Sequence, residues 1–275
     1  MGFIAKPKVM ARSTYISENL TQKQIDFMLM LDDYELDIFS LEEIKKQASD
    51  KFEDVNELVE NLVHKKILSR IERGKYCRSN YRDENVIGCN LVLDGTIAYW
   101  SALNKHGLTE QFPNSVFVQT TKIKKDKTAF GVYYKFIKIA PSKRQGIIQE
   151  GFGNHRYQMT TIEKTIADCF DLPQYSGGYA ELIRAFNEAE IDNEKLIAAC
   201  TAIHNIAATK RMGYLAEVLR KNELQRFIQY AQTQVKERYN LFDPSGEEDG
   251  TFISKWKLRL NISSSQIMDI ISKQY

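Results

Sequence analysis

The sequence predicts an α+β protein with a small N-terminal domain and a larger mixed α/β domain that has a helical C-terminal part. Three observations predict this class. A helical stretch followed by a basic hairpin pattern lies within residues 54–78, β-rich alternation lies within 115–159, and helical periodicity grows more frequent from residue 160 onwards. A chain of 275 residues is expected to form two domains. We place them at residues 1–85 and 90–275, joined by a polar, aperiodic connection.

The first two helices of the N-terminal domain are predicted from caps and apolar spacing. Thr21 can cap a helix whose apolar side is formed by Ile25, Met28, Leu29 and Leu31. Ser40 opens a second short helix, because Glu43 three residues later completes a capping box. The lead-in before Thr21 carries Lys6, Lys8 and Arg12. It is either a frayed terminus or a basic arm.

A third helix and a hairpin complete this domain. The apolar residues of the helix recur at helical spacing, at Val55, Leu58, Val59, Leu62 and Val63. Two β-favouring pieces, 67–72 and 75–78, then flank Arg73-Gly74, where glycine can adopt the positive φ of a tight turn. Three short helices followed by a hairpin are typical of a winged helix-turn-helix.

Charge places a candidate DNA interface on the hairpin. Between residues 63 and 82 there are seven cations and one acid, a local net charge of +6. Such a cluster is typical of a phosphate-binding surface. The third helix carries Glu53, Asp54, Glu57 and Glu60 on its outer face, so we expect the hairpin to contribute more affinity than the helix. The candidate contacts are Asn56, Asn61, Lys65, Lys66, Arg70, Arg73, Lys75 and Arg78.

The second domain is predicted to begin with a helix from Asp94, its cap, to Gly107, its stop. Two strands follow at 115–121 and 132–139, and further short strands at 147–152 and 155–159. Thr160 and Glu163 form a capping box for the next helix. Residues 122–144 hold eight cations against one acid, including Lys122, Lys124 and Lys125. This second basic cluster is either a solvated hairpin tip or a second nucleic-acid surface.

Residue patterns for catalysis, metals and cofactors are missing from the sequence. The four cysteines form no C-x-x-C pair, and the four histidines are isolated, so we expect no metal site and no disulfide framework. Asp168 and Asp171 share a helix, where salt bridges are a better expectation than a metal. His155-Arg156 is the best remaining candidate for an unassigned site. We expect no cofactor, no enzymatic activity, no membrane partner and a cytoplasmic location.

Two segments of the second domain resemble AbiEi-family antitoxins. They are residues 97–125 (IAYWSALNKHGLTEQFPNSVFVQTTKIKK) and residues 157–186 (YQMTTIEKTIADCFDLPQYSGGYAELIRAF). The family pairs an A-L-x-x-H-G-L-T-x-Q-x-P stretch with an E-K-T…D-C-x-D-x-P-x-Y-x-G-G stretch. The segment LVENLVHKKILSRIERGKYCR is similar to the winged helix of the family, which ends in R-G-x-Y. The resemblance spans residues 20–210, and the region after Lys221 has no clear counterpart.

The resemblance implies an antitoxin of a bacterial type IV toxin–antitoxin and abortive phage-infection system. Such proteins repress their own operon by binding double-stranded DNA repeats in its promoter. They counteract a nucleotidyltransferase-like toxin without requiring a stable complex. By position, the resemblance assigns DNA contact to Arg70, Arg73, Lys75 and Arg78 of the wing and to Asn56, Asn61 and Lys65 of the helix. Two alternatives remain open: a module that sequesters a protein partner, and an enzyme acting on nucleic acid through the second basic cluster.

Overall fold

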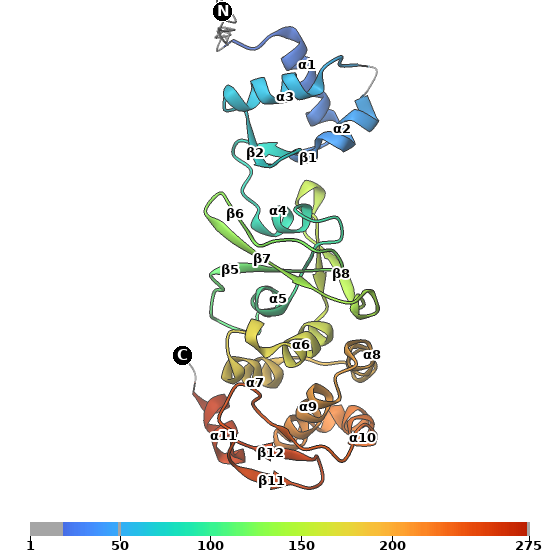
Figure 1. The fold of residues 1–275 in the computed structure, drawn as a ribbon, viewed down its shortest axis with the longest axis vertical. Coiled ribbons are helices and arrows are strands. Elements are labelled where there is room, and N and C mark those ends of the chain that lie inside the picture. The colour runs from blue at the N-terminus through green and yellow to red at the C-terminus, as the bar shows by residue number, and fades with distance from the viewer. Residues whose placement is uncertain (1–18, 49–50, 274–275) are drawn as a thin grey trace, which may run out of the picture. The chain divides into compact units, whose positions relative to one another are not determined.

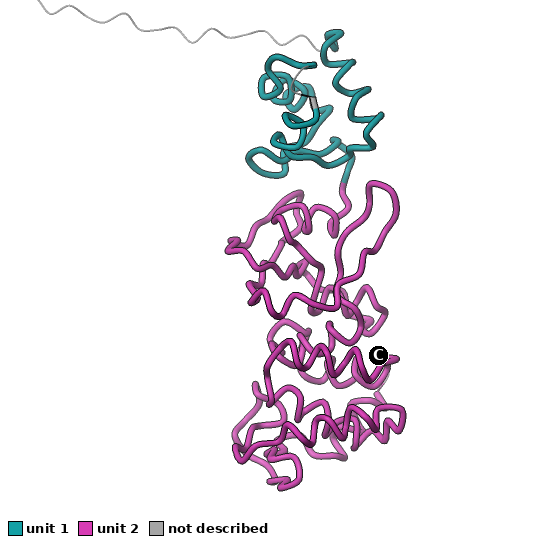
Figure 2. The backbone as a smooth tube through the Cα atoms, turned by 90° about the vertical axis from the view of Figure 1, so that its right-hand side faces the viewer, with its two compact units in different colours: residues 1–81 teal, residues 82–275 magenta. Residues whose placement is uncertain are grey.

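A computed structural model describes residues 19–48 and 51–273, and it has a mixed α+β fold, as predicted (Figure 1). The cations at Lys6, Lys8 and Arg12 lie outside these residues. The chain divides into two compact units, residues 1–81 (unit 1) and 82–275 (unit 2), shown in Figure 2. The division falls slightly before the end of the predicted first domain. Within the described ranges, no helix is both long enough and apolar enough to cross a membrane.

Unit 1 contains three helices and a three-stranded antiparallel sheet in the order β1-β3-β2. The elements are α1 (Gln22–Asp33), β1 (Ile38–Ser40), α2 (Leu41–Ala48), α3 (Val55–His64), β2 (Leu68–Glu72) and β3 (Lys75–Arg78). The predicted caps are confirmed. Thr21 accepts a hydrogen bond from the Gln24 backbone N–H, and Ser40 and Glu43 form a reciprocal capping box.

The predicted apolar face of α1 is confirmed at Met28 and Leu31, which lie in or against the core, and is wrong at Ile25 and Leu29. Ile25 and Leu29 are exposed, whereas Phe27, Met30 and Leu31 are buried. The helix is apolar on more than one side, and the aromatic ring decides its orientation. Phe27 makes edge-on contacts with Phe39 and Phe52, at centroid distances of 6.2 and 5.4 Å. Burying this ring against two others is favoured over burying the two aliphatic side chains.

Unit 2 is built on a six-stranded sheet in the order β6-β7-β5-β4-β9-β8. Its strands are β4 (Thr96–Ile97), β5 (Ser115–Thr120), β6 (Lys127–Ala129), β7 (Val132–Lys138), β8 (Ile147–Glu150) and β9 (Tyr157–Thr160). Helix α4 (Glu84–Asn90) covers one face, where Gly88 lies against Tyr134 and Val118. Helices α5 (Tyr99–Lys105) and α6 (Ile162–Asp171) cover the other face (Figure 1).

Two predicted helix starts in unit 2 are wrong. The chain from Asp94 does not begin a helix, because residues 96–97 form strand β4 between β5 and β9. The Asp94 carboxylate accepts hydrogen bonds from the Thr120 hydroxyl and from the backbone and side chain of Thr121. Helix α6 begins one residue later than predicted. Its cap is Thr161, while Thr160 hydrogen-bonds the Thr165 hydroxyl at 2.6 Å.

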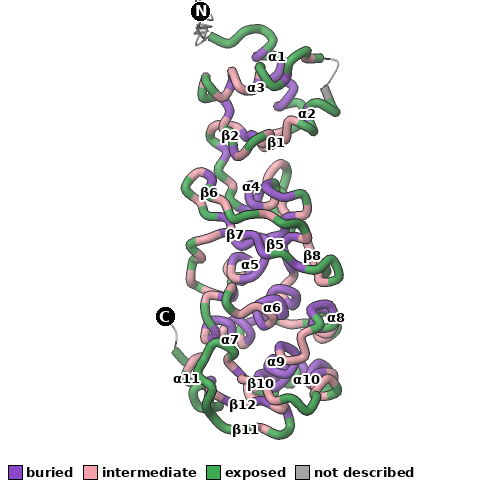
Figure 3. Tube along the Cα trace, in the orientation of Figure 1, coloured by how far each residue is buried: buried purple, intermediate pink, exposed green. Residues whose placement is uncertain are grey.

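The rest of unit 2 is mainly helical, as predicted. Its elements are α7 (Tyr179–Glu188), α8 (Asn193–Ile203), α9 (Ile206–Val218), α10 (Gln225–Thr233), β10 (Asn240–Leu241), β11 (Thr251–Ile253), β12 (Leu258–Leu260) and α11 (Ser264–Ser272). Short 3-10 turns are Pro141–Lys143, Gly153–His155, Pro173–Tyr175 and Asn222–Leu224. The three strands form a small sheet in the order β10-β12-β11. Helices α6, α7 and α9 carry long buried stretches (Figure 3).

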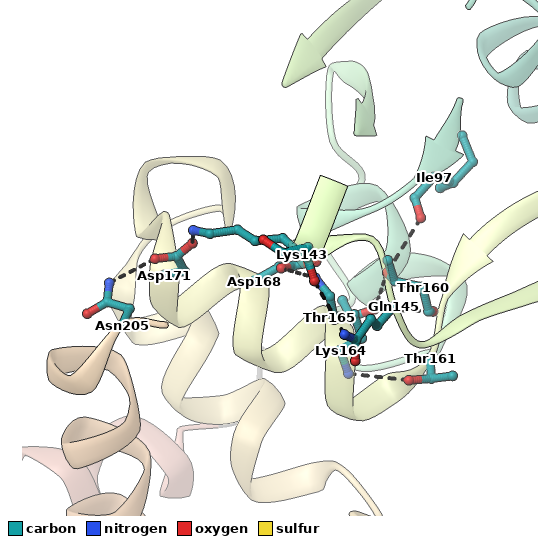
Figure 4. A network of polar contacts seen from close by, with 11 residues as sticks. Ile97, Lys143, Gln145, Thr160, Thr161, Lys164, Thr165, Asp168, Asp171 and Asn205 are labelled. Atoms are coloured by element: carbon teal, nitrogen blue, oxygen red, sulfur yellow. Dashed lines mark hydrogen bonds and ion pairs between the residues drawn. The ribbon is translucent and has the colours of Figure 1, made fainter. Parts of the chain in front are cut away.

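Two acidic residues of α6, Asp168 and Asp171, take part in ion pairs. Asp168 pairs with Lys164, and both side chains are almost completely buried. Asp171 accepts from Lys143 at 2.6 Å and from the Asn205 amide at 2.8 Å (Figure 4). The expected salt-bridged face is therefore confirmed. Within the described ranges, no cluster of three histidine, cysteine or acidic side chains could hold a metal ion.

Helix α9 requires a glycine where it meets the last strands. A Cβ added to Gly213 would lie 2.6 Å from the Trp256 ring and 2.7 Å from Ala231 Cβ. Helix propensity alone would make Gly213→Ala stabilising by about 1 kcal/mol. We expect overpacking to reverse the sign and to lower the free energy of unfolding by about 1–3 kcal/mol. Urea denaturation measures this change, and a stabilised variant would contradict the packing described here.

A buried lysine makes the stability of unit 2 depend on pH in the alkaline range. Lys210 Nζ donates to the backbone oxygens of Arg238 and Lys257, both at 2.9 Å. Burial, followed by the charges of Arg211 and Arg238, lowers the pKa of Lys210 to about 8. A neutral amine retains two N–H donors for these two acceptors. The fold therefore accepts the uncharged form without losing either hydrogen bond.

The pKa shift of Lys210 predicts the sign of a pH effect. The folded pKa lies below the unfolded value of 10.5, so the unfolded chain binds more protons between these values. The stability of wild type should therefore rise relative to Lys210→Met from pH 8 to pH 10.5, by at most about 3 kcal/mol. Denaturant unfolding of both proteins across this range tests it. A constant difference between them would contradict the shift.

Candidate nucleic-acid interface

The hairpin of unit 1 is formed by β2 and β3 and turns at Arg73-Gly74. Gly74 has φ +80°, the left-handed conformation that favours glycine, so this turn is confirmed. The register shifts between Arg70 and Glu72, which marks an irregularity in β2. The Gly74 carbonyl accepts from the Leu41 N–H at 2.8 Å and so joins the turn to the start of α2. The basic tip is therefore held in place by backbone contacts.

The hairpin is also joined to α3. Tyr76 is buried, and its hydroxyl donates to Glu60 Oε1 at 2.6 Å. Burial, together with the hydrogen bond and negative charge of Glu60, raises the pKa of Tyr76 to about 12. Arg70 Nη1 lies 3.7 Å from the same carboxylate oxygen. Glu60, one of the acids on the outer face of α3, is thus held against Tyr76 and Arg70.

Two of the sequence-predicted cations, Arg78 and Lys65, are joined to α1 by partners inside unit 1. Arg78 has a side chain only 15% exposed, and it pairs with Asp32 of α1 and with Asp37 at 3.7 Å. Lys65 Nζ donates to the Asn19 carbonyl at 2.5 Å and to Gln24 Oε1 at 2.8 Å. Both cations connect the end of α3 and the hairpin to α1, and both would have to leave these partners to reach a phosphate.

The remaining candidates of unit 1 differ in exposure. Asn56, Lys66, Arg70 and Arg73 are exposed. Lys75 is half-buried and pairs with Glu72 at 3.1 Å. Asn61 is half-buried in a cavity of about 540 Å³ whose lining includes Glu53, Asp54 and Glu57. The acidic character predicted for the outer α3 face therefore persists in the folded unit. Among these candidates, the exposed positive charge lies on the hairpin and just before it.

The structure adds one cation that the sequence analysis missed. Lys45 of α2 lines an open pocket of about 500 Å³ together with Arg73, Gly74 and Lys75 of the hairpin tip. Ser40, Leu41 and Glu42 at the start of α2 complete its lining. In the sequence Lys45 belongs to an amphipathic helix far from the hairpin, and only the pairing of β1 with β3 brings them together.

The other predicted contacts, Lys122, Lys124 and Lys125, belong to unit 2. They lie on the loop between β5 and β6, where Lys122 and Lys125 are exposed and Lys124 Nζ lies 5.9 Å from the Phe136 ring centroid. His155, the other candidate of unit 2, donates from Nδ1 to Asp83 Oδ2 at 3.0 Å. Asp83 also caps α4, so this contact has a structural role.

Comparisons with known proteins bear on the fold alone. No family model matches the chain, and no curated protein matches it. Among solved structures it is similar to the RV2827C protein from Mycobacterium tuberculosis, with a TM-score of 0.63 and 12% sequence identity. The match covers 94% of this chain and 97% of that one, so both units take part in it. The resemblance to AbiEi antitoxins stays a prediction.

Proposed function

We propose that unit 1 is a winged helix-turn-helix that binds duplex DNA mainly through its hairpin. The observation that carries this proposal is the exposure of Arg70 and Arg73 on a hairpin held to α2 and α3, with Lys45 beside the tip. Lysine and arginine in this arrangement neutralise phosphates. The α3 helix contributes less to affinity, because its acids repel the DNA backbone.

We further propose that the protein is an antitoxin that represses its own operon and counteracts a nucleotidyltransferase-like toxin. The resemblance of residues 97–125 and 157–186 to AbiEi antitoxins supports this role. In this proposal the promoter contains repeated operator sites, and a stable complex with the toxin is not required.

A gel shift with the promoter fragment of the protein's own operon tests the proposed DNA binding. The expected result is a shifted complex that survives an excess of unrelated competitor DNA. Toxin rescue is a separate assay, in which cells that express the adjacent toxin should grow again when this chain is co-expressed. A promoter fragment that is not shifted would contradict autorepression. Cells that do not grow again in the rescue assay would contradict antitoxicity.

A protein-binding role for unit 1 is the second candidate. The observation that favours it is the exposure of Ile25 and Leu29, one turn apart on α1. Exposed apolar side chains at this spacing can dock against a partner helix. Co-purification of the toxin with this chain at physiological salt, abolished by Ile25→Ser/Leu29→Ser, would favour this role over DNA binding.

A further inference from the structure

Three loops of unit 2 meet at one end of the six-stranded sheet. Ile97 of β4 pairs with Val118 of β5 and with Met159 of β9. Because β4 runs antiparallel to β5 and parallel to β9, the start of β4, the end of β5 and the start of β9 lie together. The loops there are residues 91–95, 121–126 and 151–156. We call this region the three-loop end.

Each of these loops presents one large apolar side chain to solvent. Leu93 is 93% exposed, Ile123 is 84% exposed and Phe152 is 79% exposed. Single exposed apolar side chains are ordinary, but a contiguous group marks an interaction surface. Neighbouring strands lie about 4.8 Å apart. The order β5-β4-β9 therefore places the bases of the three loops in a row about 10 Å long.

The same end of the sheet is positively charged. Lys122, Lys125 and Arg156 are exposed on the loops, and Lys138 is exposed where β7 ends beside β5. Two of the acids nearby, Asp94 and Asp126, are engaged in structural hydrogen bonds. Asp94 accepts from Thr121 N at 2.9 Å, and Asp126 accepts from Tyr133 Oη and Phe136 N, each at 2.9 Å. Their hydrogen bonds hold the loops in shape and leave the lysines facing outward.

We propose that the three-loop end docks on an anionic lipid bilayer. Leu93, Ile123 and Phe152 enter the boundary between headgroups and acyl chains, and the surrounding cations lie at the level of the anionic headgroups. The positive charge disfavours a second copy of this chain as the occupant, because two such surfaces repel each other.

The spacing favours a bilayer over duplex DNA. Apolar side chains enter DNA singly, between base pairs about 3.4 Å apart. Three exposed apolar side chains on loops whose bases lie in a row about 10 Å long match an extended apolar layer better. The sequence predicts no membrane partner because it contains no spanning segment, but peripheral docking requires none. This inference is independent of the DNA binding proposed for unit 1.

Co-sedimentation of the full chain with vesicles tests the proposal. The probes are vesicles of phosphatidylcholine alone and of phosphatidylcholine mixed with phosphatidylglycerol. Wild type should bind the anionic vesicles at least about tenfold more tightly than the neutral ones, and added salt should weaken this binding. Leu93→Ser/Ile123→Ser/Phe152→Ser should lose at least about tenfold of the affinity. The side chains it changes are exposed, so its thermal unfolding should match that of wild type.

Phe112→Ser is the matched control. Phe112 is 85% exposed in the same unit, just before the start of β5 and thus at the opposite end of the sheet. The Phe112→Ser variant should bind vesicles as tightly as wild type does. Three results would overturn the proposal: no preference of wild type for anionic vesicles, undiminished binding by the triple variant, or an equal loss with Phe112→Ser. If wild type does not bind vesicles and the triple variant loses affinity for duplex DNA, the surface is reassigned to nucleic acid.

Discussion

Replacing Arg70, Arg73 and Lys75 together by alanine should weaken binding to the operator by about 10²- to 10³-fold at physiological salt. Two of these side chains are exposed on the hairpin, and the third lines the pocket at its tip. Removing three phosphate contacts also removes the counterion release that accompanies them. The measurement is a fluorescence anisotropy titration with a labelled operator duplex.

A matched variant separates local contact from net charge. Lys195, Arg226 and Lys236 are exposed on the helical part of unit 2. Their triple alanine variant changes the net charge by the same amount as the hairpin variant and should retain wild-type affinity within about threefold, because screening confines electrostatic effects to about 10 Å. Equal losses in the two variants would mean that overall charge, and not the hairpin, determines binding.

Lys164→Met should lower the free energy of unfolding of unit 2 by about 3–5 kcal/mol at pH 7, because it leaves the buried Asp168 without its counter-charge. Asp168 Oδ2 already has no hydrogen-bond partner among the described residues. The double variant Lys164→Met/Asp168→Leu should recover most of the loss, since an apolar pair often replaces a buried ion pair at little cost. Urea denaturation of the single and double variants measures both effects.

The loss of unfolding free energy in Lys164→Met should be smaller at acidic pH. Burial raises the pKa of Asp168 to about 6, against the lowering effect of Lys164. Without that lysine the folded pKa rises further, so the folded variant holds a proton that the unfolded chain has released. Its stability deficit should therefore shrink as the pH falls from 7 towards 5. A deficit independent of pH would show that lost packing, and not the uncompensated charge, destabilises the variant.

The features predicted correctly from the sequence depend on nearby residues. The Thr21 and Ser40 caps and the Arg73-Gly74 turn each follow from a few adjacent side chains and backbone conformations. The predictions that were wrong depended on distant contacts. The Asp94 carboxylate binds Thr121 instead of capping a helix, and the Phe27 ring reorients α1. Both contacts form only when the tertiary structure is complete.

The same distinction applies to the candidate interface. The charge pattern located the cluster of cations, but it could not separate cations with internal partners from exposed ones. Arg78 and Lys65 are held by Asp32 and Gln24, which precede them by more than 40 positions. Lys45 joins the cluster through the pairing of β1 with β3. The pairing of charges across the fold is a tertiary property that local charge density does not reveal.

The salt dependence of operator binding tests the central claim most directly. For wild type, the logarithm of the affinity should fall linearly with the logarithm of the salt concentration. The slope of the Arg70→Ala/Arg73→Ala variant should be shallower by about 1.8, or about 0.9 for each phosphate contact removed. Parallel lines for the two proteins, or a wild-type chain that fails to bind its operator at low salt, would contradict DNA binding through the hairpin.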